Sequence, residues 1–312
     1  MSHGLTKWDT MFSVSQKPWH KLGTVVENAP NVHEALVLAG LDWHASLEPA
    51  FSARGEALKT QVVRRSDTDQ IIGEVGDRYK PLQNVQAFSF FDPFVESGQA
   101  SFETAGSLFG GSKVWIMCKI SKDPLVVGSG DEIMPYILLS TSHDGSSAVR
   151  VGYTPIRVVC NNTLTMAHGH GSSKLIKVKH SLNVVSNLNS IQETMNLVNR
   201  NFEATVEQYK DLTKRQIVTS DLEKYVDLVF STKGEDEKRE RKSRVYDDIL
   251  QNFEQGQGSS LPTAHGTAWG AYNAVTEYLS HSRGSSQENR YNSLWFSGQD
   301  LNKKALEYAL TL

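Results

Sequence analysis

The stretch ETAGSLFGGSKVWIMCKI, residues 103–120, decides the fold class. Two strand-like runs, 101–109 and 113–120, are rich in aromatic and aliphatic residues and flank the pair Gly110-Gly111. A glycine pair between two such runs is typical of a β-hairpin, because glycine adopts the backbone angles that tight turns require. The stretch therefore predicts an antiparallel hairpin.

Similar signals lie upstream of this hairpin. Three strand-like runs cover residues 44–51, 58–65 and 70–75, and a polar turn joins the last two. Two helices are predicted beside these strands, at residues 32–39 and 84–96. Asn31 and Glu34 form a capping-box pattern at the start of the first helix. Asn84 is expected to cap the second helix, and Pro93 to kink it.

The pattern changes downstream of the hairpin. Further strands are predicted at residues 136–140, 148–153 and 175–180, with a short helix or turn near 161–167. Helical spacing then dominates, at residues 182–216, 220–230, 239–253, 267–281 and 299–310. Strands first and helices later predict an α+β fold. A hairpin-rich antiparallel part with a packed helix, residues 1–181, precedes a helical part, residues 182–312.

Composition bounds the class of protein. A chain of 312 residues with 39% hydrophobic and 21% charged residues is globular rather than disordered. No window approaches the roughly eighteen consecutive apolar residues of a membrane span, and the first residues lack a secretory-signal pattern. Cys118 and Cys160 lie in apolar runs, which indicates buried thiols in a reducing compartment. A cytoplasmic protein without membrane association is expected.

Positive charge is segregated in the middle of the chain. The formal net charge is −3, yet no acidic residue lies between Asp144 and Glu193. Segregation of this kind is the pattern expected of a phosphate-binding surface; the alternative is that a strand-rich core segment simply lacks acids. The predicted phosphate contacts are Arg150, Arg157, Lys174, Lys177 and Lys179, with Tyr153, Arg78 and Lys113 as secondary candidates.

The same segment has three sharper interpretations. Cys160 with His143 fits thiol catalysis, although flanking valines favour a buried thiol. His143 and Asp144 with His168 and His170 fit a metal site, for which a His-Gly-His sequence is weak evidence. The sequence HGHGSSK fits a mobile loop that touches a nucleic-acid strand.

A polar stripe marks the helix predicted at residues 267–281. Asn273, Glu277 and His281 recur at intervals of four and share one helix face. Such a stripe fits a divalent metal or nucleotide site, and equally a hydrogen-bonded network that docks the helix on the strand-rich part. Whether this stripe and the His143-Asp144 pair are functional or structural is left open by the sequence.

Five long motifs occur in a fixed order: PWHKLG (18–23), GDRYKPLQN (76–84), ETAGSLFGG (103–111), SHDGSSAVRVGYTPIRVVCNNTL (142–164) and GTAWGAYNAVTEY (266–278). Together they resemble a phage/plasmid-like family catalogued as a domain of unknown function, number 932, over nearly the whole chain. The resemblance implies a protein of phages, plasmids and integrated elements, which often serve replication or recombination. The order of elements is also similar, in architecture only, to Rad52/Redβ-type single-strand annealing proteins.

These observations favour a single-stranded DNA-binding and annealing protein of mobile elements. It is expected to act as a homo-oligomer, because aligned basic grooves add many weak phosphate contacts along one strand. No cofactor is required, and an enzyme is the less favoured class. Two alternatives remain: a metal-dependent enzyme of nucleic-acid or nucleotide metabolism, and a protein–protein adaptor that acts on a host pathway.

Overall fold

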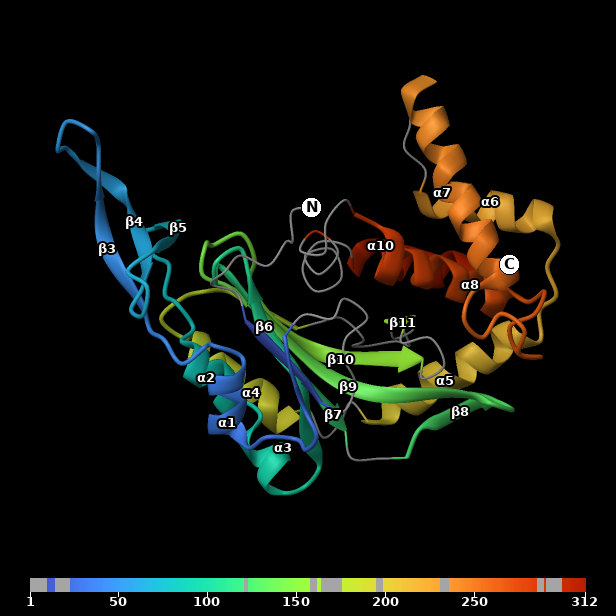
Figure 1. The fold of residues 1–312 in the computed structure, drawn as a ribbon, viewed down its shortest axis with the longest axis horizontal. Helices are drawn as coiled ribbons and strands as arrows, with labels where there is room; N and C mark the ends of the chain where they lie inside the picture. The colour runs from blue at the N-terminus through green and yellow to red at the C-terminus, as the bar shows by residue number, and fades with distance from the viewer. Residues whose placement is uncertain are drawn as a thin grey trace.

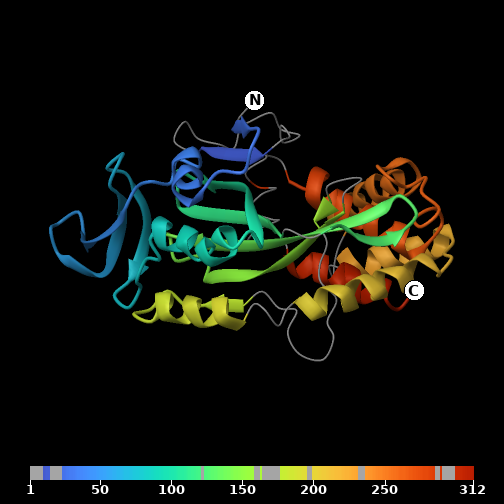
Figure 2. The ribbon, with the colours of Figure 1, turned by 90° about the horizontal axis from the view of Figure 1, so that it is seen from below.

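The computed structural model describes residues 10–14, 23–120, 123–157, 162–163, 176–194, 199–230, 236–284, 289 and 299–312. The predicted α+β class is confirmed, because mostly antiparallel strands fill the first half and helices follow. A large sheet lies in the middle of the molecule (Figures 1 and 2). A small sheet projects at one end of it, and most of the later helices gather at the other.

The large sheet has the strand order β11-β10-β9-β7-β6-β1-β2, with β12 also paired to β10 and β8 to β9. Only β1 and β2 run parallel among its described pairs. The predicted hairpin is β6 and β7, and its turn has positive φ at Gly110 and Gly111 (69° and 98°). The strands are β1 (Met11–Val14), β2 (Thr24–Val26), β6 (Ala100–Leu108), β7 (Lys113–Ile120), β8 (Leu125–Gly128), β9 (Asp131–Ser142), β10 (Val149–Arg157), β11 (Asn162–Thr163) and β12 (Ile176–Val178).

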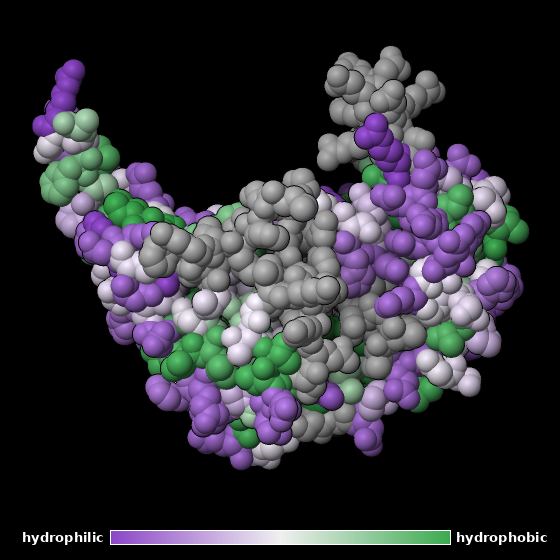
Figure 3. All heavy atoms as spheres, in the orientation of Figure 1, coloured by the Kyte–Doolittle hydropathy of each residue, from purple (hydrophilic) through white to green (hydrophobic). Residues whose placement is uncertain are grey.

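The small sheet consists of β3 (Ala45–Phe51), β4 (Ala57–Arg65) and β5 (Ile71–Gly76) in that order, and we call it the arm. It matches the three strands predicted there. Its strands are antiparallel, and it extends well beyond the body of the molecule (Figures 1 and 3). Val63 is buried against the body, whereas the opposite face carries an ion pair between Arg64 and Glu48 at 2.9 Å.

Three short helices precede the large sheet's central strands. α1 (Val32–Leu38) has the predicted capping box between Asn31 and Glu34. The helix predicted at 84–96 is divided into α2 (Asn84–Ser89) and α3 (Asp92–Glu96), because Pro93 fits the first turn of a helix better than its interior. The predicted cap at Asn84 is wrong. Gln83 occupies the cap position, and the buried Asn84 side chain bonds elsewhere.

The C-terminal half is helical, as predicted, and the described residues of the long helix expected at 182–216 belong to two elements. They are α4 (Val184–Thr194) and α5 (Asn199–Thr213). A five-residue π-helix, η2 (Tyr278–Ser282), continues α8. The remaining helices are α6 (Thr219–Phe230), α7 (Asp236–Gln255), α8 (Ala268–Glu277) and α10 (Gln299–Ala309).

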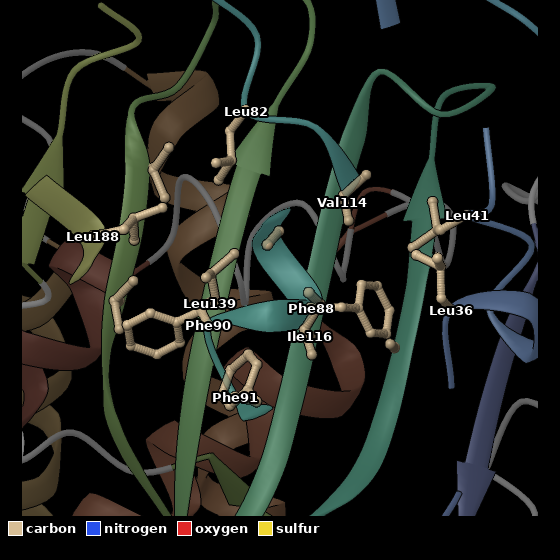
Figure 4. Close-up of a cluster of buried hydrophobic side chains, with 14 of the residues drawn as sticks. Leu36, Leu41, Leu82, Phe88, Phe90, Phe91, Val114, Ile116, Leu139 and Leu188 are labelled. Atoms are coloured by element: carbon tan, nitrogen blue, oxygen red, sulfur yellow. The ribbon is translucent and has the colours of Figure 1, made fainter. Parts of the chain in front are cut away.

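Two large hydrophobic clusters stabilise the fold. The first lies between one face of the large sheet and α1 to α4; Figure 4 shows Phe88, Phe90 and Phe91 packed over Ile116 and Leu139. The second joins α5 to α8 and α10 to the β8–β9 end of the sheet. α4 therefore packs with the strands, although it lies beyond the predicted boundary at residue 181. The division into two domains stays a prediction.

Candidate nucleic-acid interface

A line of side chains crosses the large sheet near the arm. Arg150 of β10 lies opposite Ser140 of β9 on one side and Lys177 of β12 on the other. Ser140 in turn lies opposite Trp115 of β7. Residues directly opposite each other in a sheet share a face, so Arg150 and Lys177 point to the same side. Their neighbours Val149 and Val151 point into the first hydrophobic cluster, so the cations lie on the face away from that cluster.

A second line runs next to the first. Lys113 lies opposite Ser142, two residues from the Trp115–Ser140 pair, and Lys179 follows two residues after Lys177. The strands lie about 4.8 Å apart, so the three steps from β7 to β12 span about 14 Å. Lys177 and Lys179 are exposed, while Lys113 and Arg150 are partly buried. Lys113 also lies over the Phe109 ring, 5.3 Å from its centroid.

These two lines lie at the end of the sheet that meets the arm. β10 runs away from the arm in Figure 1, so the start of this strand, where Arg150 is the second residue, lies at the arm side. The backbone N–H of Lys80 donates to the carbonyl of His180 at 3.2 Å, which ties the turn between β5 and α2 to the segment just after Lys179. Arg78, which is exposed, belongs to this turn. Five of the eight predicted contact residues are therefore gathered in one region: Lys113, Arg150, Lys177, Lys179 and Arg78. We call this region the basic end.

Negative charge at the basic end is limited in the described part of the chain. The paired strand positions of the two lines contain no carboxylate. Asp144 follows β9, and its side chain accepts the Ser146 backbone N–H at 2.9 Å. The exposed Asp77 precedes Arg78 in the turn between β5 and α2. Glu103 lies further along β6, where burial raises the pKa of its carboxyl and Lys119 opposes that rise. The basic end is therefore a local cationic surface on a chain of net negative charge.

Three predicted contacts are not gathered there. Arg157 is the last residue of β10, seven residues from Arg150, which corresponds to about 23 Å along the strand. Arg150 and Arg157 therefore lie far apart along β10, and a contact of Arg157 with a nucleic-acid strand stays a prediction. Tyr153 is partly buried and packs against both large hydrophobic clusters, and burial raises its pKa to about 12; a ring held this way is poorly placed to stack on a base. Lys174 lies outside the described residues.

A buried polar network supports the basic end from beneath. The Tyr79 hydroxyl donates to the carbonyl of Ser142 at 2.8 Å, and its ring stacks on His180 at 4.7 Å. The His143 side chain is fully buried and bonds Asn84 at 3.0 Å. Burial, with a smaller contribution from His180, lowers the pKa of His143 to about 3. The GDRYKPLQN and SHDGSS motifs thus meet in space as structural parts.

The family of the chain follows from these motifs. A family model described as "Domain of unknown function (DUF932)" matches residues 71–295, most of the chain. The chain belongs to this family. No curated protein and no solved structure matches the chain. All five residues of the basic end lie within the region that defines the DUF932 family, whereas β3 and β4 of the arm lie before it.

A second contact connects the arm to the DUF932 region, and no pattern in the sequence indicated it. Arg65 is buried and forms two hydrogen bonds with Asp67, at 2.9 and 2.7 Å. It also donates to the carbonyl of Gly110 at 2.8 Å and lies over the Trp43 ring at 4.5 Å. The guanidinium therefore fixes the arm to the β6–β7 turn, next to Lys113.

One residue of the polar stripe in the fifth DUF932 motif, Asn273, makes a structural contact, and a role for Glu277 and His281 stays a prediction. Asn273 is buried, and its amide donates to the carbonyl of Trp269 at 2.8 Å. The Trp269 ring N–H donates to the buried Asp131 carboxyl at 2.8 Å, which docks α8 on β9. Glu277 ends α8, and His281 lies in the π-helix.

The metal and thiol interpretations gain no support from the described residues. Within them, no three His, Cys, Asp or Glu side chains are grouped as metal ligands. Cys118 is a buried free thiol whose pKa is raised by burial. His168, His170 and Cys160 lie outside the described residues, as does most of the PWHKLG motif. In the described part of the chain, no helix has the length and apolar character of a membrane span.

Proposed function

We propose that this DUF932 protein binds a single nucleic-acid strand across its basic end and promotes annealing as a homo-oligomer. The observation that carries the proposal is the alignment of Arg150 with Lys177 on one sheet face, beside Lys113 and Lys179. Cations spread over about 14 Å on one face allow contacts to more than one phosphate of the same backbone. The proposal requires no cofactor and no chemical step.

Several features support a single strand rather than a duplex groove. The basic end lies on a sheet and a turn, and no helix of the described chain carries its cations. A sheet surface with scattered cations holds a flexible backbone through charge, which is largely independent of sequence. A net charge of −3 confines such binding to one part of the surface and makes each subunit's affinity modest. Several subunits along one strand would add their contacts.

The direct test is a fluorescence-anisotropy titration of a labelled single-stranded oligonucleotide over a salt series. We compare the wild-type protein with Lys177→Ala/Lys179→Ala, which removes two exposed cations. For single strands each phosphate contact contributes about 0.7 to the slope of log K against log salt. The double variant is therefore expected to bind more weakly and to reduce the slope by about 1.4.

Lys214→Ala/Lys224→Ala is the matched control. Both side chains are about three-quarters exposed, at 73% and 75%, and both lie in the helical part. This control is expected to keep the wild-type affinity and slope. Absence of wild-type binding at low salt, or equal weakening by the two double variants, would refute the proposed interface.

A further inference from the structure

The end of the arm carries exposed apolar and cationic side chains. Phe51 is 61% exposed and Leu58 is 47% exposed. Phe51 lies opposite Ala57 across the hairpin, so Lys59, two residues further, shares its face. Arg54 lies in the connecting turn and is exposed. Glu56 is the acidic residue of this turn, so Arg54 and Lys59 leave the tip with a net positive charge. We call this group the arm tip.

The arm tip is well ordered by its own hydrogen bonds. The Ser52 N–H donates to the carbonyl of Glu56 at 2.8 Å, and the Gly55 N–H donates to the carbonyl of Ser52 at 2.9 Å. The Ser52 hydroxyl oxygen accepts the N–H groups of Arg54 and Glu56 at 3.3 and 3.2 Å. A hairpin whose backbone is already ordered loses less conformational freedom on binding than a flexible loop does. Exposed aromatic anchors of this kind are typical of protein–protein contacts.

A complementary surface lies on the same molecule. A hollow of about 470 Å³ between α1, α2 and α3 is lined mainly by Val32, Leu36, Val85, Phe88, Asp92 and Glu96. Val85 is 47% exposed there. A second hollow of about 350 Å³ shares Val85 and Asp92 and continues toward α4. We call the two together the helix groove.

The charges of the two surfaces are opposite. The described lining of the helix groove contains Asp92 and Glu96 and no lysine or arginine. The arm tip presents Phe51 between Arg54 and Lys59. The arm tip is an apolar projection with cations, and the helix groove is an apolar hollow with carboxylates. The two surfaces are therefore complementary in shape and charge, and such complementarity favours one specific partner over others.

We propose that the arm tip of one copy docks in the helix groove of a second copy. Phe51 would enter the hollow beside Val85, and Arg54 and Lys59 would pair with Asp92 and Glu96. The contact joins two different surfaces, so it forms a reciprocal pair when each arm enters the other's groove and a ring or filament when the copies follow one another. This inference rests on the proposed function in one respect: the contact would supply the homo-oligomer that annealing needs.

Charge exchange tests this contact in the absence of nucleic acid. Sedimentation velocity over a concentration series measures self-association of the wild-type chain, of an arm variant (Arg54→Glu/Lys59→Glu) and of a groove variant (Asp92→Lys/Glu96→Lys). Each variant alone is expected to self-associate more weakly, on the order of tenfold. An equimolar mixture of the two is expected to recover association, because each negative arm then meets a positive groove and each positive arm a negative groove.

Phe51→Ala tests the apolar part of the contact. It is expected to weaken association by a similar factor, whereas Val218→Ala, at a 64% exposed position in the helical part, leaves it unchanged. A monomeric wild-type protein at all concentrations, or variants that associate like the wild type, would overturn the inference. So would a mixture that fails to recover. Since no strand is present, these outcomes are separate from failure of strand binding.

Discussion

The Nε2 atom of His143 lies 3.0 Å from the Oδ1 atom of Asn84, and both side chains are almost completely buried. The Asn84 amide nitrogen donates to the carbonyl of Leu41 at 3.1 Å, so its Oδ1 is the acceptor and His143 donates from Nε2. The pair joins the start of α2 to the end of β9. It holds the turn after β9 at the base of the arm, beside the cations of the proposed interface.

Removal of this pair is expected to destabilise the fold. Asn84→Ala leaves the buried His143 N–H and the Leu41 carbonyl without a partner, which costs about 1–3 kcal/mol for each such group. Urea unfolding measures the loss in free energy of unfolding. Asn189→Ala, at an exposed position of α4, is the control and should change stability by less than about 0.5 kcal/mol. Equal stability of the two variants would contradict the assignment.

Stability is expected to fall below neutral pH because of His143. Its folded-state pKa of about 3 lies below the unfolded value near 6.5, so the unfolded chain binds more protons between these values. The contribution is complete above pH 6.5 and decreases on acidification through this window, by up to about 1.4 kcal/mol per pH unit. His143→Gln should remove this part of the slope in urea titrations at several pH values. Asn189→Ala, which changes no titratable group, should keep the wild-type slope.

The junction between arm and body depends on a missing side chain at Gly73. A β-carbon there would lie 2.5 Å from the Asp144 α-carbon and 2.7 Å from the His143 carbonyl oxygen. Gly73→Ala is therefore expected to cost about 1–3 kcal/mol and to separate β5 from the turn after β9. Gly76→Ala in the same strand meets no atom within 4 Å and should be close to neutral. Thermal unfolding measures the melting temperature of both variants. Equal melting temperatures for the two would contradict this account.

The docking of α8 on the sheet depends on the buried carboxyl of Asp131. The Thr263 hydroxyl donates to it at 2.7 Å, beside the Trp269 ring N–H. Thr263→Val removes one donor without changing side-chain shape and is expected to lower the free energy of unfolding by about 1–3 kcal/mol. Thr263→Ser keeps the hydroxyl and should cost clearly less. If the serine and valine variants were equally unstable, the hydrogen bond would not be the cause.

Local patterns in the sequence predicted the elements well where each element is decided by its own residues. The glycine pair after Phe109 and the capping box at Asn31 both act within a few residues, and both are present. Elements that depend on distant partners were missed. β1 is four residues long and pairs with β6 and β2, and the role of Arg65 needs Gly110, 45 residues away.

The candidate site shows the same limit. The absence of acids after Asp144 indicated the cationic segment, and Arg150 and Lys177 do meet. Spacing along the chain could not show that Arg157 lies at the far end of the same strand, or that Tyr153 is held between two cores. The first depends on how far β10 extends beyond the predicted end at residue 153, and the second on which face of the strand is buried; pairing with β9 sets both.

Photo-crosslinking tests the central claim most directly. The wild-type protein is irradiated with a single-stranded oligonucleotide that contains 5-bromodeoxyuridine, and crosslinked peptides are identified by mass spectrometry. Strand binding at the basic end predicts crosslinks in the segments around Arg150 and around Lys177 and Lys179, and their loss in the presence of high salt. Crosslinks confined to the helices α5 to α7, or none under conditions that saturate binding, would contradict the claim.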